Sequence, residues 1–97
     1  MKLVYFLENK STLAIKIGVA DDPVARVRRL QTSTDCELKL IGVIKPSVLS
    51  ETTELQLHRR FAEHRLGGRG EWFAPIIRRD VLAILAYAAS AGLSGRA

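Results

Sequence analysis

The sequence has little of what disulfide-stapled and membrane-spanning proteins rely on. Its single cysteine, Cys36, cannot form an internal disulfide, and no cluster of cysteine and histidine has the spacing of a structural zinc site. The longest apolar stretch, residues 81–93, contains a serine and a glycine and is shorter than the roughly 20 residues that cross a bilayer. The first apolar run, residues 3–7, is too short for a signal peptide. We therefore expect a cytoplasmic protein with no membrane contact.

Aromatic residues are also scarce, at 6% of the chain, and the length of 97 residues allows only one domain. Hydrophobic residues nevertheless make up 47% and charged residues 26%, which is typical of a globular domain and excludes a disordered or fibrous chain. We expect a single domain over residues 1–93 and a flexible C-terminal tail over residues 94–97.

Negative charge is in the minority. The chain has 15 Lys and Arg against 10 Asp and Glu, a net charge of +5, and most of the excess lies after residue 57. Arginine predominates among the basic residues, and its guanidinium binds a phosphate with two donors at once. This pattern favours an anionic partner, with nucleic acid first and a membrane surface second.

The first half of the chain reads as a hairpin, a helix and a strand. Residues 3–7 form an apolar run and residues 13–19 alternate between apolar and other positions, so we expect two strands joined by a polar turn at residues 8–12. An acidic pair followed by Pro23 predicts a helix that ends near residue 31. A third strand is expected over residues 37–45.

The second half reads as two helices with a short extended piece between them. Ser50 is the expected N-cap of a helix from residue 51 to about residue 65, and a glycine-rich loop and an extended segment at residues 71–73 follow it. Asp80 is expected to cap a last helix over residues 81–91 that ends at Gly92. The order ββαβα–(β)–α predicts an α+β fold with a small antiparallel sheet flanked by helices.

The longer predicted helix carries an unusual stripe. Glu54, Leu57, His58 and Phe61 share one face at helical spacing, and half of this face is polar. An unpaired carboxylate is costly to bury, so Glu54 needs a cation or a cleft. The alternative is that the stripe drifts, which would leave Glu54 in solvent and His58 as a packing residue. The Glu-x-x-x-His pair by itself is a weak metal signal, because it lacks the further ligands of a zinc protease motif.

Two other features allow two interpretations each. Lys16 interrupts an otherwise aliphatic strand, where it can be a functional cation or lie on a solvated face. Trp72 can belong to the core or form a stacking platform for a base. Most arginines are expected to be solvated surface charges, although any of them can contact a nucleic-acid backbone.

Five segments, in their order and spacing, resemble the GIY-YIG nuclease superfamily. They are Val4-Tyr5-Phe6, then Lys16-Ile17-Gly18, then Arg26 eight residues later, then Glu54 with Leu57-His58, and finally Glu71-Trp72-Phe73. The resemblance runs from about Leu3 to Phe73, with the last helix completing the module. It is strongest to the compact phage and bacterial subgroup in which KIG stands in place of YIG.

The resemblance implies a three-stranded antiparallel sheet and divalent-metal-dependent cleavage of a phosphodiester. Glu54 would hold one Mg²⁺ or Mn²⁺, which would stabilise the leaving oxygen. Tyr5 would be the general base or relay for the attacking water, and Arg26 would neutralise charge on the phosphate. His58 is a weaker catalytic candidate that would orient water or Glu54.

Two positions depart from the family pattern. Lys16 replaces the second tyrosine, and its ammonium could lower the pKa of Tyr5, hold the phosphate by charge, or mark weakened catalysis. The late asparagine of the family has no clear counterpart; Glu71 stands near its place, and we assign it no role. The expected contacts to nucleic acid are the arginines on and after the two helices, namely Arg29, Arg59, Arg60, Arg65 and Arg69.

The sequence therefore predicts a small metal-dependent endonuclease acting on DNA, from a phage or mobile element. A module of the same fold that binds nucleic acid or a protein without cutting is the alternative, and a purely structural role ranks third. The Ala-rich last helix is either enclosed in the core or a dimer contact. We expect a homodimer, because one active site cuts one strand.

Overall fold

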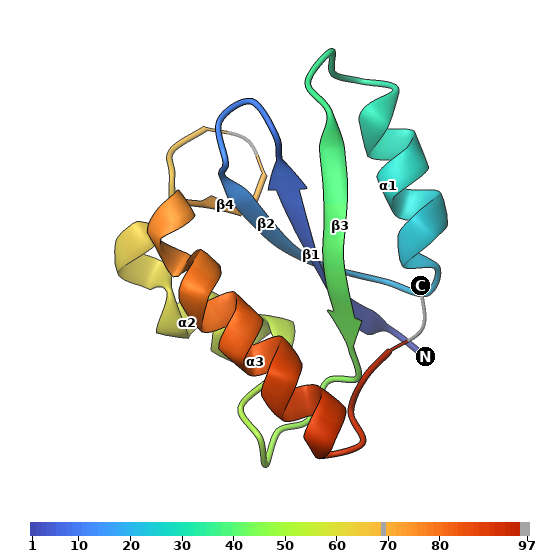
Figure 1. Ribbon diagram of the computed structural model, residues 1–97, viewed down its shortest axis with the longest axis vertical. Helices are drawn as coiled ribbons and strands as arrows, with labels where there is room; N and C mark the ends of the chain where they lie inside the picture. The colour runs from blue at the N-terminus through green and yellow to red at the C-terminus, as the bar shows by residue number, and fades with distance from the viewer. Residues whose placement is uncertain (69, 96–97) are drawn as a thin grey trace.

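The protein is a four-stranded antiparallel sheet with helices on both faces (Figure 1). The computed structural model describes residues 1–68 and 70–95. In this part of the chain the sheet order is β3-β1-β2-β4. Its strands are β1 (Leu3–Asn9), β2 (Ile15–Ala20), β3 (Leu38–Ile44) and the two-residue β4 (Trp72–Phe73). The predicted α+β class is confirmed, and the short extended piece at residues 71–73 joins the sheet as its fourth strand.

Strand β1 lies in the middle of the sheet because its apolar run is buried on both faces. Val4 and Phe6 pack beneath α2 (Glu54–Arg60) and α3 (Arg78–Ser90), while Tyr5 and Leu7 face α1 (Pro23–Gln31). Figure 1 shows α2 and α3 together on one side and α1 on the other. Two 3₁₀ turns, Ala62–His64 and Pro75–Ile77, complete the regular structure of the described residues.

Helix α1 begins and ends where the sequence predicts. The Asp22 side chain accepts a hydrogen bond from the Ala25 amide at 3.0 Å, and Pro23 is the buried first residue. Both signals are local, which is why they can be read from the sequence. The helix lies against β1, β2 and β3, and its Arg26 interacts with Tyr5 of the sheet.

Helix α2 is shorter than the predicted span of residues 51–65, and Ser50 is not its cap. Glu51 takes a left-handed conformation with φ 56°, and Thr52 is buried, so the helix cannot begin there. Thr53 is the N-cap instead and forms a reciprocal capping box with Gln56. The helix therefore starts at Glu54, which puts this carboxylate in its first turn.

The prediction that Glu8 lies in a turn is wrong. Glu8 belongs to β1, where it is 1% exposed. Its carboxylate accepts a hydrogen bond from Lys10 Nζ at 3.1 Å and another from the Arg78 guanidinium. Burial raises the pKa of Glu8, but the hydrogen bonds and charges of these two partners outweigh it and hold the pKa below its usual value. The pair with Arg78 ties the start of α3 to the sheet.

Helix α3 starts at Arg78, so Asp80 lies in its first turn and is not its cap. It buries Val81, Ile84 and Ala88, while Leu82 and Tyr87 are 44% and 52% exposed. The alternative that this helix is enclosed on all sides is therefore wrong. None of the helices formed by the described residues is long and apolar enough to span a membrane.

The chain after α3 returns to the sheet. Gly92 takes a φ of 75° and ends the helix, as predicted. The expected loose tail is held at its first two residues, because Ser94 bridges to Ile44 and the Gly95 amide donates to the Val43 carbonyl at 2.9 Å. Residues 96–97 of that expected tail lie outside the described residues.

Candidate functional site

Three segments meet at the outer edge of β2, just before β4 begins. Strand β4 pairs with Ile15 and Lys16 of β2. The next residue, Ile17, donates its amide to the Glu71 carbonyl at 3.2 Å, and its own carbonyl lies 2.9 Å from Nε2 of His58 on α2. This edge therefore holds the segment before β4 on one side and α2 on the other.

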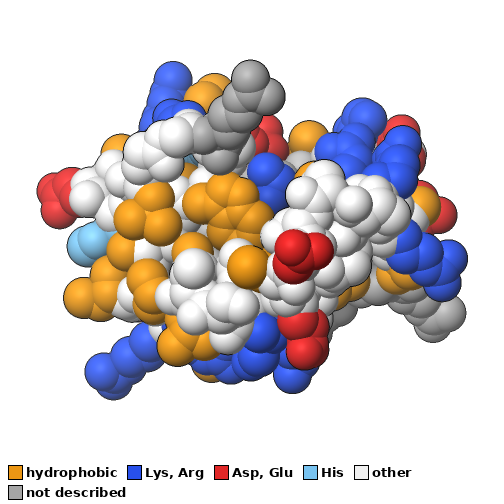
Figure 2. Space-filling view, turned by 90° about the horizontal axis from the view of Figure 1, so that it is seen from above, with side chains coloured by type: hydrophobic (Ala, Val, Ile, Leu, Met, Phe, Trp, Pro, Cys, Tyr) orange, Lys and Arg blue, Asp and Glu red, His pale blue; other side chains and the backbone are white. Residues whose placement is uncertain are grey.

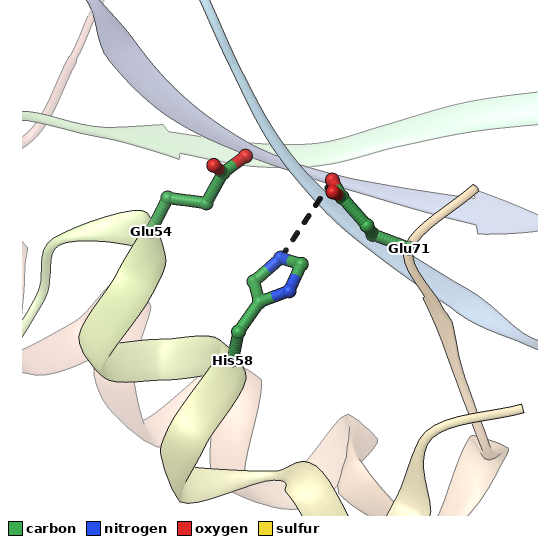
Figure 3. Close-up of side chains that lie close together, drawn as sticks. All are labelled: Glu54, His58 and Glu71. Carbon is green, nitrogen blue, oxygen red and sulfur yellow. Dashed lines mark ion pairs between the residues drawn. The ribbon is translucent and has the colours of Figure 1, made fainter.

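Two carboxylates and an imidazole gather at this edge (Figure 3). One side-chain N or O atom from each of Glu54, His58 and Glu71 lies within 4.8 Å of the others. The separation between His58 Nε2 and Glu71 Oε2 is 3.9 Å. All three residues are partly buried, so the cluster is open to solvent on one side. Glu54 is therefore not left in solvent, as the alternative of a drifting stripe requires, although His58 does pack against Phe73 as that alternative expects.

Tyr5 lies near the same site, on the face of the sheet that α1 covers. It is 1% exposed and pairs with Gly18 on β2, whose missing side chain leaves room for the phenol ring. Burial raises the pKa of the Tyr5 hydroxyl. The charge and a hydrogen bond of Arg26 act against this, and the negative charges of Glu54 and Glu71 add to the rise. The pKa of the Tyr5 phenol therefore depends on the Arg26 guanidinium from α1 and on both carboxylates.

Lys16 contacts Trp72 on the neighbouring strand. Its Nζ lies 5.9 Å from the centre of the indole, and the two residues are paired in register. Trp72 itself is partly buried and packs against the core cluster that contains Tyr5. Of the three roles left open for Lys16, lowering the pKa of Tyr5 is not supported, because this pKa is raised and the cation that opposes the rise is Arg26.

The predicted arginine contacts are dispersed. Arg26 reaches the site and Arg29 follows it by one helical turn on α1, where it is exposed. On α2, Arg59 and Arg60 follow Glu54 by five and six residues, so they point away from the Glu54–His58 face. Arg60 lies 5.2 Å from the Phe61 ring.

The two remaining arginines lie after α2. Arg65 is exposed beside β4, and Arg69 lies outside the described residues. In Figure 2, Lys and Arg side chains stand at several separate places around the rim of the face shown, so this face carries no single basic patch.

Glu71 is the site residue to which sequence reasoning gave no role. Its position is set by β4 and the residues that pair with it. The Leu66 amide donates to the Trp72 carbonyl at 2.9 Å and the Ala74 amide to the His64 carbonyl at 2.8 Å. This pairing places residues 64–66 beside residues 72–74 and holds Glu71 at the edge of β2. The available signal was its position directly before an apolar, aromatic strand.

One comparison with known proteins gives a match. The model of the T5orf172 domain family matches residues 2–87, a range that includes all the site residues from Tyr5 to Glu71. No curated protein and no solved structure matches the chain significantly.

Proposed function

The chain belongs to the T5orf172 domain family, a phage-associated family of endonuclease-like domains, and we propose that it is a divalent-metal-dependent endonuclease that hydrolyses phosphodiester bonds in DNA. The order of its segments supports the further proposal that it is a GIY-YIG-like module of the KIG type. The observation that carries this proposal is the meeting of a phenol, a guanidinium and two carboxylates at one strand edge. Such a set offers ligands for a hard cation and donors for a phosphate.

The donor set fits Mg²⁺ or Mn²⁺. These ions take oxygen ligands at about 2.1 Å in octahedral geometry, so their ligand atoms lie about 3–4 Å apart. One carboxylate oxygen of Glu54 and one of Glu71 lie within 4.8 Å of each other, which is close to this separation. Glu54 would hold the ion, which when bound supplies a Lewis acid for the leaving oxygen.

The remaining residues act on the phosphate and on a proton. Arg26 lies beside the Tyr5 hydroxyl and neutralises charge on the phosphate, and Lys16 adds a second cation on the same face of β2. Because the pKa of Tyr5 is raised, its phenol keeps its proton at neutral pH. Tyr5 therefore serves as a hydrogen-bonding relay that orients the attacking water rather than as a standing base.

Two observations also favour an alternative function. A protonated Tyr5 and a lysine in place of the second tyrosine are also compatible with a module that binds nucleic acid or a partner protein without cutting it. In both cases Arg29, which is exposed on α1 one helical turn after Arg26, contacts the backbone of DNA. A homodimer would supply the second active site that cutting both strands requires.

Nicking of supercoiled plasmid in Mg²⁺ or Mn²⁺ tests the enzyme. Wild-type protein should nick, Glu54→Ala and Glu54→Gln should not, and Glu63→Gln should nick normally. Glu63 is the matched control, because it is an exposed glutamate outside the metal-ligand cluster. Plasmid binding without nicking by every variant would overturn the enzyme and leave the binding module.

A further inference from the structure

We propose that His58 is a positioning residue and not a metal ligand. It donates its Nε2 hydrogen to the Ile17 carbonyl and so fixes the edge of β2 to which the Glu71 backbone is hydrogen-bonded. Glu54 and Glu71 then remain as the two protein ligands of the metal. This last step rests on the proposed function, whereas the role of His58 at the strand edge does not.

The hydrogen bond decides the tautomer of the ring. A backbone carbonyl only accepts hydrogen bonds, so the 2.9 Å contact to Ile17 requires that Nε2 carries a hydrogen. A ring nitrogen that carries hydrogen has no lone pair for a metal. The nitrogen within 3.9 Å of the Glu71 carboxylate is this same Nε2. In metal-binding histidines the arrangement is reversed, since the ligating nitrogen is free and the other one donates to a carbonyl or carboxylate.

The ring is held where it lies. It packs edge-on against Phe73, with ring centres 5.1 Å apart and planes at 88°. Leu57 and Phe61, on the same side of α2, are buried in the core and anchor the helix. The imidazole cannot turn its other nitrogen toward the carboxylates without breaking both the contact with Phe73 and the bond to Ile17.

Ile17 is the link between His58 and Glu71. Its carbonyl is the acceptor for His58, and its amide donates to the Glu71 carbonyl at 3.2 Å. Ile17 is fully buried, so a carbonyl deprived of His58 is left poorly solvated. Both backbone groups of one residue thus connect α2 to the segment that carries the second carboxylate.

The assignment predicts the choice of metal. Two carboxylates and water suit Mg²⁺ and Mn²⁺, whereas an imidazole ligand would shift the preference toward Zn²⁺ and Co²⁺. The two roles of His58 therefore differ in a property that is measured by binding alone. They also differ in the state of the imidazole before any metal is added.

The metal-free test uses nitrogen NMR of the imidazole and hydrogen exchange of the Ile17 amide. Wild-type His58 should show a hydrogen on Nε2 that stays when Mg²⁺ is added. His58→Gln retains an N–H donor, so the Ile17 amide should stay protected, while His58→Ala should exchange about tenfold faster. His64→Gln and His64→Ala are matched controls at the other histidine and should match wild type. A bare Nε2, or equal Ile17 exchange in all variants, would overturn the proposal.

The metal test is Mn²⁺ affinity by electron paramagnetic resonance, which needs no cleavage. His58→Gln should bind within about threefold of wild type, and His58→Ala should bind about 10–100-fold more weakly. If both variants lose Mn²⁺ affinity equally, and if both also lose a preference of the wild-type protein for Zn²⁺, His58 is a metal ligand and the proposal is overturned. If wild-type protein neither cuts DNA nor binds metal, the proposed function fails, and the exchange of the Ile17 amide still decides the role of His58.

Discussion

Gly18→Ala should displace the central phenol of the site. A Cβ at Gly18 would lie 2.5 Å from the Tyr5 hydroxyl oxygen and 2.6 Å from the ring carbon that bears it, well inside van der Waals contact. The backbone of Gly18 is not in the left-handed region, so the strain is purely steric. Tyr5 pairs with Gly18 and is itself buried, so the ring can only move by disturbing the core.

The size of this effect follows from the overlap. Forcing a methyl group into a packed core costs about 1–3 kcal/mol, and in a domain of this length each kcal/mol lowers the midpoint by about 4–8 °C. Urea and thermal unfolding should show this loss. Plasmid nicking below the midpoint should fall as far as it does in Tyr5→Phe, because the hydroxyl leaves its place beside Arg26.

Two glycines provide controls. Gly67→Ala meets no atom within 4 Å and should unfold like wild type. Gly42→Ala places a Cβ 2.6 Å from Leu85 Cδ2, which strains β3 against α3 away from the site, so it should lose stability and keep nicking. In a Tyr5→Ala background the cost of Gly18→Ala should vanish. An equal cost in both backgrounds, or a Gly18→Ala protein as stable as Gly67→Ala, would refute the reasoning.

Three further predictions concern charge. Glu8→Gln should cost about 1.5–3 kcal/mol at neutral pH, because Arg78 loses a buried ionic partner. The folded pKa of Glu8 is lowered, so its contribution to the free energy of unfolding is present above the ordinary glutamate pKa of about 4.3 and is lost as the pH falls through the folded value. In urea unfolding, the stabilities of wild type and Glu8→Gln should therefore converge as the pH falls through that value. Burial raises the folded pKa of Tyr5, so its contribution to the free energy of unfolding is complete below about pH 10 and is lost as the pH rises through the folded value. Tyr5→Phe should remove both this alkaline loss and the late-titrating phenol absorbance. Arg29→Ala should reduce the slope of log affinity for DNA against log salt by about 1, while Arg60→Ala should not, and equal slopes would exclude the proposed contact.

The parts of the fold that are set by local signals could be read from the sequence. The apolar run of β1 and the Asp-Pro start of α1 are examples, because burial on both faces and capping each need only neighbouring residues. The start of α2 was harder. Ser50 and Thr53 are both good caps, and the choice depends on the left-handed Glu51 and on the reach of Gln56 back to Thr53.

The site depends on contacts that no local pattern carries. Glu54 and His58 share a helix face, so their proximity was predictable from their spacing. Glu71 reaches them because a two-residue strand pairs with β2 and because residues 64 and 66 are hydrogen-bonded to residues 74 and 72. The polar run of residues 8–12 likewise looked like a turn from its first residue, since one of the two cations that pair with buried Glu8 is Arg78, far along the chain.

Cleavage and binding measured together on one end-labelled DNA duplex test the central claim most directly. Wild-type protein and Glu54→Gln should bind the duplex with similar affinity, because this substitution keeps the shape of the side chain and all the basic residues. In Mn²⁺ only the wild-type protein should then cut it. Equal binding with no cutting by wild type, or equal cutting by both proteins, would contradict a metal-dependent endonuclease centred on Glu54.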